Sequence, residues 1–208
     1  ANAPFFATAN GAKSVAQAIS VIGTQRLYEV TLAQSLQGVV PKDVPGFIRG
    51  SYGYWQHSVA VAVLAEELAR RTKTPAQPYL FTAGILHDIG VLVLAPFIAE
   101  HASALVSALE KDRGDFCAAE DRVLGANHAA IGAAVLERWH IPHEIVLVAR
   151  WHPSPSLTPK RAHQATVDLV HVADCLSLSL GYGGDVGELA RQLDSNASAR
   201  LGLRPEDL

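Results

Sequence analysis

Six imidazole and carboxylate side chains stand in largely apolar stretches of this chain, and such groups are typical metal ligands. They are His57, His87, Asp88, His128, His152 and Asp174. Burying an ionised carboxylate without a partner is very costly, so each aspartate must be neutralised, strongly hydrogen-bonded or bound to a cation. Imidazole and carboxylate ligands suit Fe, Mn, Ni or Zn rather than Ca or a thiolate-bound metal. The alternative to a metal site is that these buried side chains form hydrogen bonds to one another, since spacing in the sequence alone does not show that the six converge.

The His87-Asp88 pair lies inside the apolar run Ala83–Leu94, around which the rest of the chain is organised. The apolar residues before the pair fit the end of a buried helix, and Gly90 fits a break where the chain turns. A helix C-terminus carries partial negative charge, and Asp88 adds to it. The natural complement at this position is therefore a cation.

The other four residues each require a helix of their own. His57 stands beside Trp55 in the first turns of a helix whose run Val59–Ala65 is apolar on all sides, which predicts that it is buried. Asn127 is expected to cap the helix that carries His128 in its first turn. His152 precedes a proline, which places it at a helix C-terminus. Asp174 shares an apolar face with Val167 and Val170 on a helix expected over 162–180.

No strand-like alternation of useful length interrupts these helical patterns, so the predicted fold class is all-α. Ser14 and Thr24 can begin two short helices in a small N-terminal lobe over residues 1–50. Residues 41–53 are a connection, 51–182 the helical core, and 183–208 a short helix and a polar tail. Within the core, Asp115 can cap a helix that Gly125 ends.

Composition excludes several classes of protein. The 208 residues are 49% hydrophobic and carry a formal charge of −3, which argues against a nucleic-acid binder. No apolar stretch reaches the roughly 18 residues that span a membrane, and no secretory signal is recognisable. Two cysteines make no disulfide framework, so we expect a cytoplasmic protein. The chain contains no Met, even at position 1, which predicts a fragment or a processed product.

Five stretches together resemble the HDOD (HD-related output domain) family, a bacterial signalling branch of the HD superfamily. Trp55–Ser58 looks like its W-x-H-S motif, and Ala83–Gly90 is similar to A-G-L-L-H-D-I-G. Asn127–Pro142 resembles H-x-x-x-G-A-x-L-x-x-W-x-x-P, and His171–Asp174 looks like its final V/H-x-A-D segment. Parts of residues 1–23 resemble the A-N-S stretch before the HD part, and helices that usually precede it are missing. The resemblance covers nearly the whole chain and implies a multi-helix HD bundle.

That resemblance also implies roles for the six polar residues. A primary metal site would be formed by His57, His87, Asp88 and Asp174. His128 and His152 match positions that hold a second metal in the related cyclic-di-GMP phosphodiesterases. Those enzymes carry Lys where this chain has Val91, a His-His pair where it has Trp151-His152, and a G-Y-P motif that is absent here. A cation that would neutralise phosphate charge in the transition state is thereby lost.

Three functions follow as hypotheses. The first, which we place ahead, is a signal-transduction output domain with a metal site and little or no turnover. The second is a metal-dependent phosphohydrolase that acts on a nucleotide or phosphodiester through metal-bound water. The third is a structural helical domain whose polar residues satisfy one another. Expected partners are signalling proteins or a small phosphorylated ligand, with no nucleic acid and no membrane; the sequence leaves the oligomeric state open.

Overall fold

The computed structural model describes residues 50–112, 114–159, 161–183 and 191–204, together with a few positions between 14 and 31. The chain forms two compact units, residues 1–40 and 41–208. In the first, the Ser14 hydroxyl accepts a hydrogen bond from the Gln17 N–H at 3.1 Å, as expected for a residue that caps a helix. The rest of the expected N-terminal helices and the A-N-S stretch lie outside the described residues.

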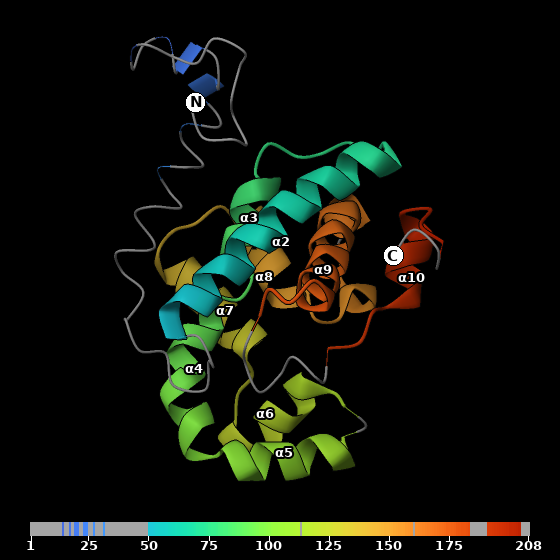
Figure 1. The fold of residues 1–208 in the computed structure, drawn as a ribbon. Coiled ribbons are helices and arrows are strands. Elements are labelled where there is room, and N and C mark those ends of the chain that lie inside the picture. Colours follow the sequence, from blue (N-terminus) through green and yellow to red (C-terminus); the bar gives the residue numbers. More distant parts are fainter. Residues whose placement is uncertain are drawn as a thin grey trace. The chain divides into compact units, whose positions relative to one another are not determined.

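The described part of the second unit is helical, and no strand occurs in it, so the all-α prediction is confirmed (Figure 1). The helices are α2 (Gly50–Thr72), α3 (Leu80–Leu86), α4 (Ile89–Glu100), α5 (Ala102–Lys111), α6 (Phe116–Leu124), α7 (His128–Arg138), α8 (His143–Trp151), α9 (Gln164–Ser179) and α10 (Ser195–Arg200). Two 3-10 turns, Pro155–Leu157 and Arg161–His163, lie between α8 and α9.

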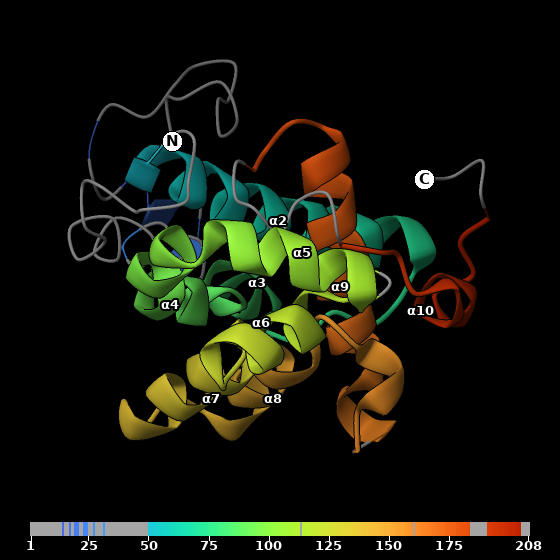
Figure 2. The same cartoon turned by 90° about the horizontal axis from the view of Figure 1, so that it is seen from below.

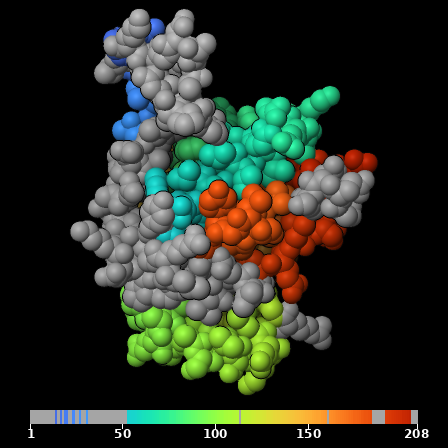
Figure 3. All heavy atoms as spheres, viewed as in Figure 1, coloured from blue at the N-terminus to red at the C-terminus, as the bar shows by residue number. Residues whose placement is uncertain are grey.

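Helix α2 packs against α3 and α9, and the space-filling view shows α2 and α9 side by side on one face (Figure 3). In its run Val59–Ala65, three residues are buried and four are half-buried, so the expected burial on all sides holds for one face only; the buried residues are Val61, Ala62 and Ala65. A side chain at Gly84 of α3 would place a Cβ 2.6 Å from the Ala62 Cα atom. The glycine therefore allows α2 and α3 to approach closely.

A second layer carries the remaining site residues. Helix α7 packs against both α4 and α8, and α7 and α8 lie side by side in Figure 2. The predicted caps are confirmed: the Asn127 side chain accepts from the Ala130 N–H, and Asp115 accepts from the Ala118 N–H. Gly125 ends α6 with a φ of 78°, in the left-handed region.

Several expected boundaries shift. Helix α2 begins at Gly50, so the last residues of the expected connection 41–53 are helical. The break between α3 and α4 falls at His87 and Asp88, and Gly90 lies inside the first turn of α4 rather than at the break. The reason is packing, because a Cβ at Gly90 would lie 2.0 Å from the His128 carbonyl oxygen. This glycine brings α4 and α7 together beside the site.

By length and composition, the segment Leu80–Glu100 could cross a membrane, although no uninterrupted apolar run of that length was expected. In the structure this segment is two helices joined by the polar His87-Asp88 turn. Within its most apolar window, 78% of the residues are buried inside the protein. Burial in the core of the protein therefore explains why this segment is so apolar.

Candidate metal centre

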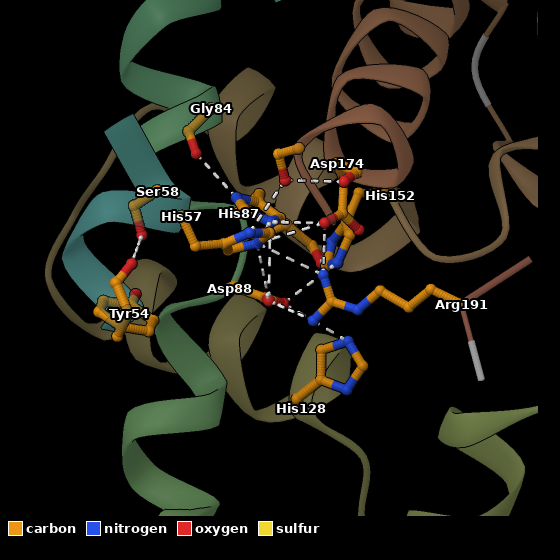
Figure 4. Close-up of polar contacts among 12 residues, drawn as sticks. Tyr54, His57, Ser58, Gly84, His87, Asp88, His128, His152, Asp174 and Arg191 are labelled. Atoms are coloured by element: carbon orange, nitrogen blue, oxygen red, sulfur yellow. Dashed lines mark hydrogen bonds and ion pairs between the residues drawn. The ribbon is translucent and has the colours of Figure 1, made fainter. Parts of the chain in front are cut away.

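All six predicted residues converge on one buried cluster, which we call the His/Asp cluster (Figure 4). Their side chains come from α2, the α3–α4 turn, α7, the end of α8 and α9, which no stretch of local sequence could bring together. Each of the six residues is at most 3% exposed: His57, His87, Asp88, His128, His152 and Asp174. That these residues bind a metal stays a prediction, but their donor atoms lie at distances that a shared ion requires.

On one side of the cluster, four donor atoms face a common point. The His57 Nε2 atom lies 3.2 Å from the Asp174 Oδ1 atom and 3.3 Å from the His87 Nε2 atom. The His87 Nε2 atom lies 3.6 Å from Asp88 Oδ2. We call this the first side; its residues are those of the predicted primary site.

On the second side, three buried atoms have no assigned hydrogen-bond partner among the described residues: Asp88 Oδ1, His128 Nε2 and His152 Nε2. The Asp88 oxygen lies 3.3 Å from the His152 nitrogen and 3.6 Å from the His128 nitrogen. A buried polar atom without a partner costs about 1–3 kcal/mol, so three of them at one point require an explanation. A bound cation would satisfy all three.

Backbone carbonyl groups fix the orientation of three of the imidazole rings. The Nδ1–H of His87 donates to the Gly84 carbonyl at 2.7 Å, and that of His152 donates to the Ala149 carbonyl at 2.9 Å. His57 Nδ1 lies 3.0 Å from the Tyr182 carbonyl. Because the Nδ1 atoms carry the protons in these bonds, the Nε2 lone pairs face the cluster. This is the arrangement in which histidine binds a metal.

The carboxylate of Glu120, on α6, fixes the orientation of the His128 ring. Its fully buried Oε2 atom accepts from the His128 backbone N–H at 3.0 Å and from the ring Nδ1–H at 2.5 Å. The sequence analysis missed Glu120, although a signal was present. The residue follows Ala119 and stands four positions after Phe116, both buried, so its carboxylate lies on an apolar helix face like that of Asp174.

Arg191 is the second residue that the sequence analysis missed, and it alters the electrostatics of the whole cluster. Its Nη1 group donates to Asp174 Oδ1 at 2.5 Å, and its Nη2 group donates to Asp88 Oδ2. The side chain is only 9% exposed. Arg138 and Arg150, the cations considered from the sequence, are exposed, and Arg150 packs over the Trp151 ring instead.

The pKa values of the cluster follow from burial and from these charges. Burial favours the neutral form of Asp88 and Asp174, but the Arg191 charge and the nearby imidazoles outweigh it and hold both pKa values well below their usual range. Burial lowers the pKa of His152 to about 4. Burial also opposes protonation of His57 and His128, yet the Asp174 and Glu120 carboxylates prevail and raise those two pKa values.

A cavity of about 290 Å³ opens beside the second side of the cluster. His128, His152, Asp174 and Arg191 line it, whereas His57 and His87 do not. Cys117 lines it too and lies near Glu120 and His128, but burial raises the pKa of its thiol far above neutrality.

The residues present fit a divalent metal ion. Imidazole nitrogen and carboxylate oxygen form buried groups of three on both sides, including His57, His87 and Asp88 on the first and Asp88, His128 and His152 on the second. This donor set matches Fe, Mn, Ni or Zn. The buried His/Asp groups can therefore hold a metal ion, and the structure does not select which.

Several solved protein structures have a fold similar to that of this chain. An HDOD protein of unknown function from Geobacter sulfurreducens matches 98% of this chain and 66% of its own length, with a TM-score of 0.77 at 23% identity. A "putative signal transduction protein" from Marinobacter aquaeolei matches 99% of this chain but only 45% of its own length (TM-score 0.69, 25% identity). A "putative phosphohydrolase" from Shewanella amazonensis matches 93% and 77% (TM-score 0.63, 26% identity).

The chain thus spans slightly less than two thirds of the Geobacter protein and less than half of the Marinobacter protein. No curated protein matches it. The HDOD domain family matches residues 1–155, about three quarters of the 208-residue chain. With the helical architecture and the convergent histidines and aspartates, this match shows that the chain belongs to the HDOD family.

Proposed function

We propose that this chain is a bacterial signal-transduction output domain that retains a metal centre and turns over little or no substrate. The observation that carries the proposal is the guanidinium of Arg191, which donates to both carboxylates of the cluster. A phosphohydrolase needs positive charge to meet the charge that develops on phosphate. The charge of Arg191 is instead balanced by Asp88 and Asp174.

Val91 supports the same conclusion. The related phosphodiesterases that the sequence resembles carry a lysine at this position, whereas Val91 is 1% exposed and packs in the core. The position therefore contributes apolar burial and no charge. Arg138 and Arg150 do not replace that cation, because both are exposed.

Recognition of a partner is the expected activity of such a domain. The Marinobacter relative is described as a "putative signal transduction protein", and the chain matches 45% of its length. We propose that the partner is a signalling protein or a small phosphorylated ligand, bound in the cytoplasm.

The second candidate is a metal-dependent phosphohydrolase. It is favoured by the cavity, which gives a small ligand access to His128 and His152 beside the partnerless Asp88 oxygen. The Shewanella relative, described as a "putative phosphohydrolase", is 26% identical over 93% of the chain.

A turnover assay separates the two candidates. Purified protein is supplied with Mn, Fe or Ni and tested on cyclic dinucleotides and a generic phosphodiester, alongside His87→Ala and Asp88→Ala variants. We expect no turnover that depends on these residues. Turnover of order 1 per second or more that vanishes in both variants would establish the hydrolase instead. Activity that persists in both variants does not come from this site.

A further inference from the structure

The two sides of the His/Asp cluster differ in the positive charge that they hold. On the first side, Asp88 Oδ2 and Asp174 Oδ1 both accept hydrogen bonds from Arg191. On the second side, the other oxygen of Asp88 and the Nε2 atoms of His128 and His152 have no assigned hydrogen-bond partner in the part of the chain that the structure describes. A single carboxylate thus presents one neutralised oxygen and one that still lacks a cation.

We propose that Arg191 permanently replaces the metal ion of the first side, so that the cluster binds one divalent ion, on the second side, through Asp88, His128 and His152. The inference deepens the proposed metal centre and rests on the proposed function only for the premise that the cluster binds a metal.

The position of the guanidinium excludes an ion from the first side. The Arg191 Nη1 atom lies 2.5 Å from Asp174 Oδ1 and 3.5 Å from His57 Nε2. A metal bound to those same two atoms would lie about 2.0–2.2 Å from each, in direct contact with the guanidinium. Two cations at that separation in a buried site repel strongly, so the ion and the arginine exclude one another.

Arg191 is held in place by the fold rather than by its two carboxylates alone. Three residues further along, the backbone N–H of Asp194 donates to the Nε2 atom of the buried His171 at 2.8 Å. Asp194 also caps α10, and Arg200 at the end of α10 binds the buried Asp168 of α9 at 2.7 Å. Displacing the arginine would therefore strain a segment fastened to α9 at two points.

The second side has the spacing of a metal site. For ligand bonds of about 2.1 Å, adjacent vertices of a tetrahedron are about 3.4 Å apart. The Asp88 Oδ1 atom lies 3.3 Å from His152 Nε2 and 3.6 Å from His128 Nε2. The lone pairs are aimed at this point because the Ala149 carbonyl and Glu120 hold the opposite ring nitrogens.

The cavity adjoins the second side of the cluster. His128 and His152 both line it, so an ion bound to them can take a further ligand from the 290 Å³ space. The Arg191 side chain lines the same cavity.

Counting bound Mn²⁺ tests the inference without any activity measurement. Titration followed by the electron paramagnetic resonance signal of free Mn²⁺ should give one ion per wild-type chain. His128→Ala and His152→Ala should each weaken binding at least tenfold, whereas Asp174→Asn should leave the count at one. Arg191→Gln should raise the count to two, with the signal of two coupled ions that share Asp88.

Arg70→Gln is the matched control, because it also breaks an arginine–carboxylate pair, with Glu67 on α2, but at the surface and away from the cluster, and it should leave the count at one. Three results would overturn the inference. The wild type could bind two ions, or it could bind none. The third is a single ion that is lost in Asp174→Asn but kept in His128→Ala. If Arg191→Gln does not fold, the His128 and Asp174 variants, which retain the arginine, decide the matter. Substrate turnover would refute the proposed function but would leave these counts unaffected.

Discussion

Gly90 lies where α4 meets α7, and replacing it with alanine should destabilise the protein more than comparable changes at other glycines. The added Cβ would stand 2.0 Å from the His128 carbonyl oxygen and 2.6 Å from the Gly132 backbone nitrogen. Ordinary contact begins at 3.4 Å, so the shorter distance falls 1.4 Å below it. Because both atoms belong to the backbone of α7, a rotamer change cannot relieve the clash.

The magnitude follows from this geometry. Overpacking a well-packed interior typically costs about 1–3 kcal/mol, and a clash against the backbone of a packed helix belongs at the upper end. Alanine recovers at most about 1 kcal/mol over glycine in a helix. We expect Gly90→Ala to lower the free energy of unfolding by about 2–3 kcal/mol, a large share of the 5–15 kcal/mol typical of a domain.

Two other glycines provide controls. At Gly132 the nearest atom to an added Cβ is the Gly90 nitrogen at 3.1 Å, so small shifts suffice, and the gain in helix propensity should bring the net cost near zero. At Gly125 the space is open but φ is 78°, so alanine should cost about 1 kcal/mol. Urea unfolding followed by circular dichroism measures all three. A loss at Gly132 equal to that at Gly90 would refute the reasoning.

Two further predictions concern the cluster. Glu120→Gln should weaken Mn²⁺ binding about 10–100-fold, because the ring of His128 loses the carboxylate that orients it. Glu137→Gln, an exposed change on α7, is the control, and equal affinities would contradict the role given to Glu120. In chelator, stability should fall as the pH drops from 6 to 4, because the pKa of His152 is about 4 in the folded chain against 6.5 as its ordinary value. Over this range the unfolded chain binds more protons than the folded one, so the loss grows as the pH approaches the folded pKa. His152→Gln should have a flatter pH profile of urea unfolding, and a slope as steep as that of the wild type would count against this assignment.

The apolar surroundings of His57, His87, Asp88, His128 and Asp174 could be recognised in the sequence, whereas the convergence of these residues with His152 was implied by the resemblance to the HDOD family. Asp174 illustrates why this works: a carboxylate on a buried helix face must have a partner, whatever the fold. Glu120 gives the same signal and could have been found in the same way. The start of α7 at His128 and the end of α8 at Trp151 were also predicted, because Asn127 and Pro153 are local signals.

Arg191 could not be found in this way. It lies outside any helix, in a part of the chain that the sequence indicates only as a short helix and a tail. No periodicity or cap relates it to Asp88, which is 103 residues away. Its place is set by tertiary contacts, such as the bond from the Asp194 N–H to His171, and these exist only once α9 and α10 are packed.

The hydrogen bonds of the cluster close very long loops of chain. His57 meets Ser177 across 120 residues, and Arg191 meets Asp88 across 103. Closing such loops costs chain entropy before any contact repays it, so local helices and their nearest packing form first. We therefore expect the cluster to be assembled after the folding barrier has been crossed. Weakening its bonds should then chiefly raise the rate of unfolding and leave the rate of folding nearly unchanged.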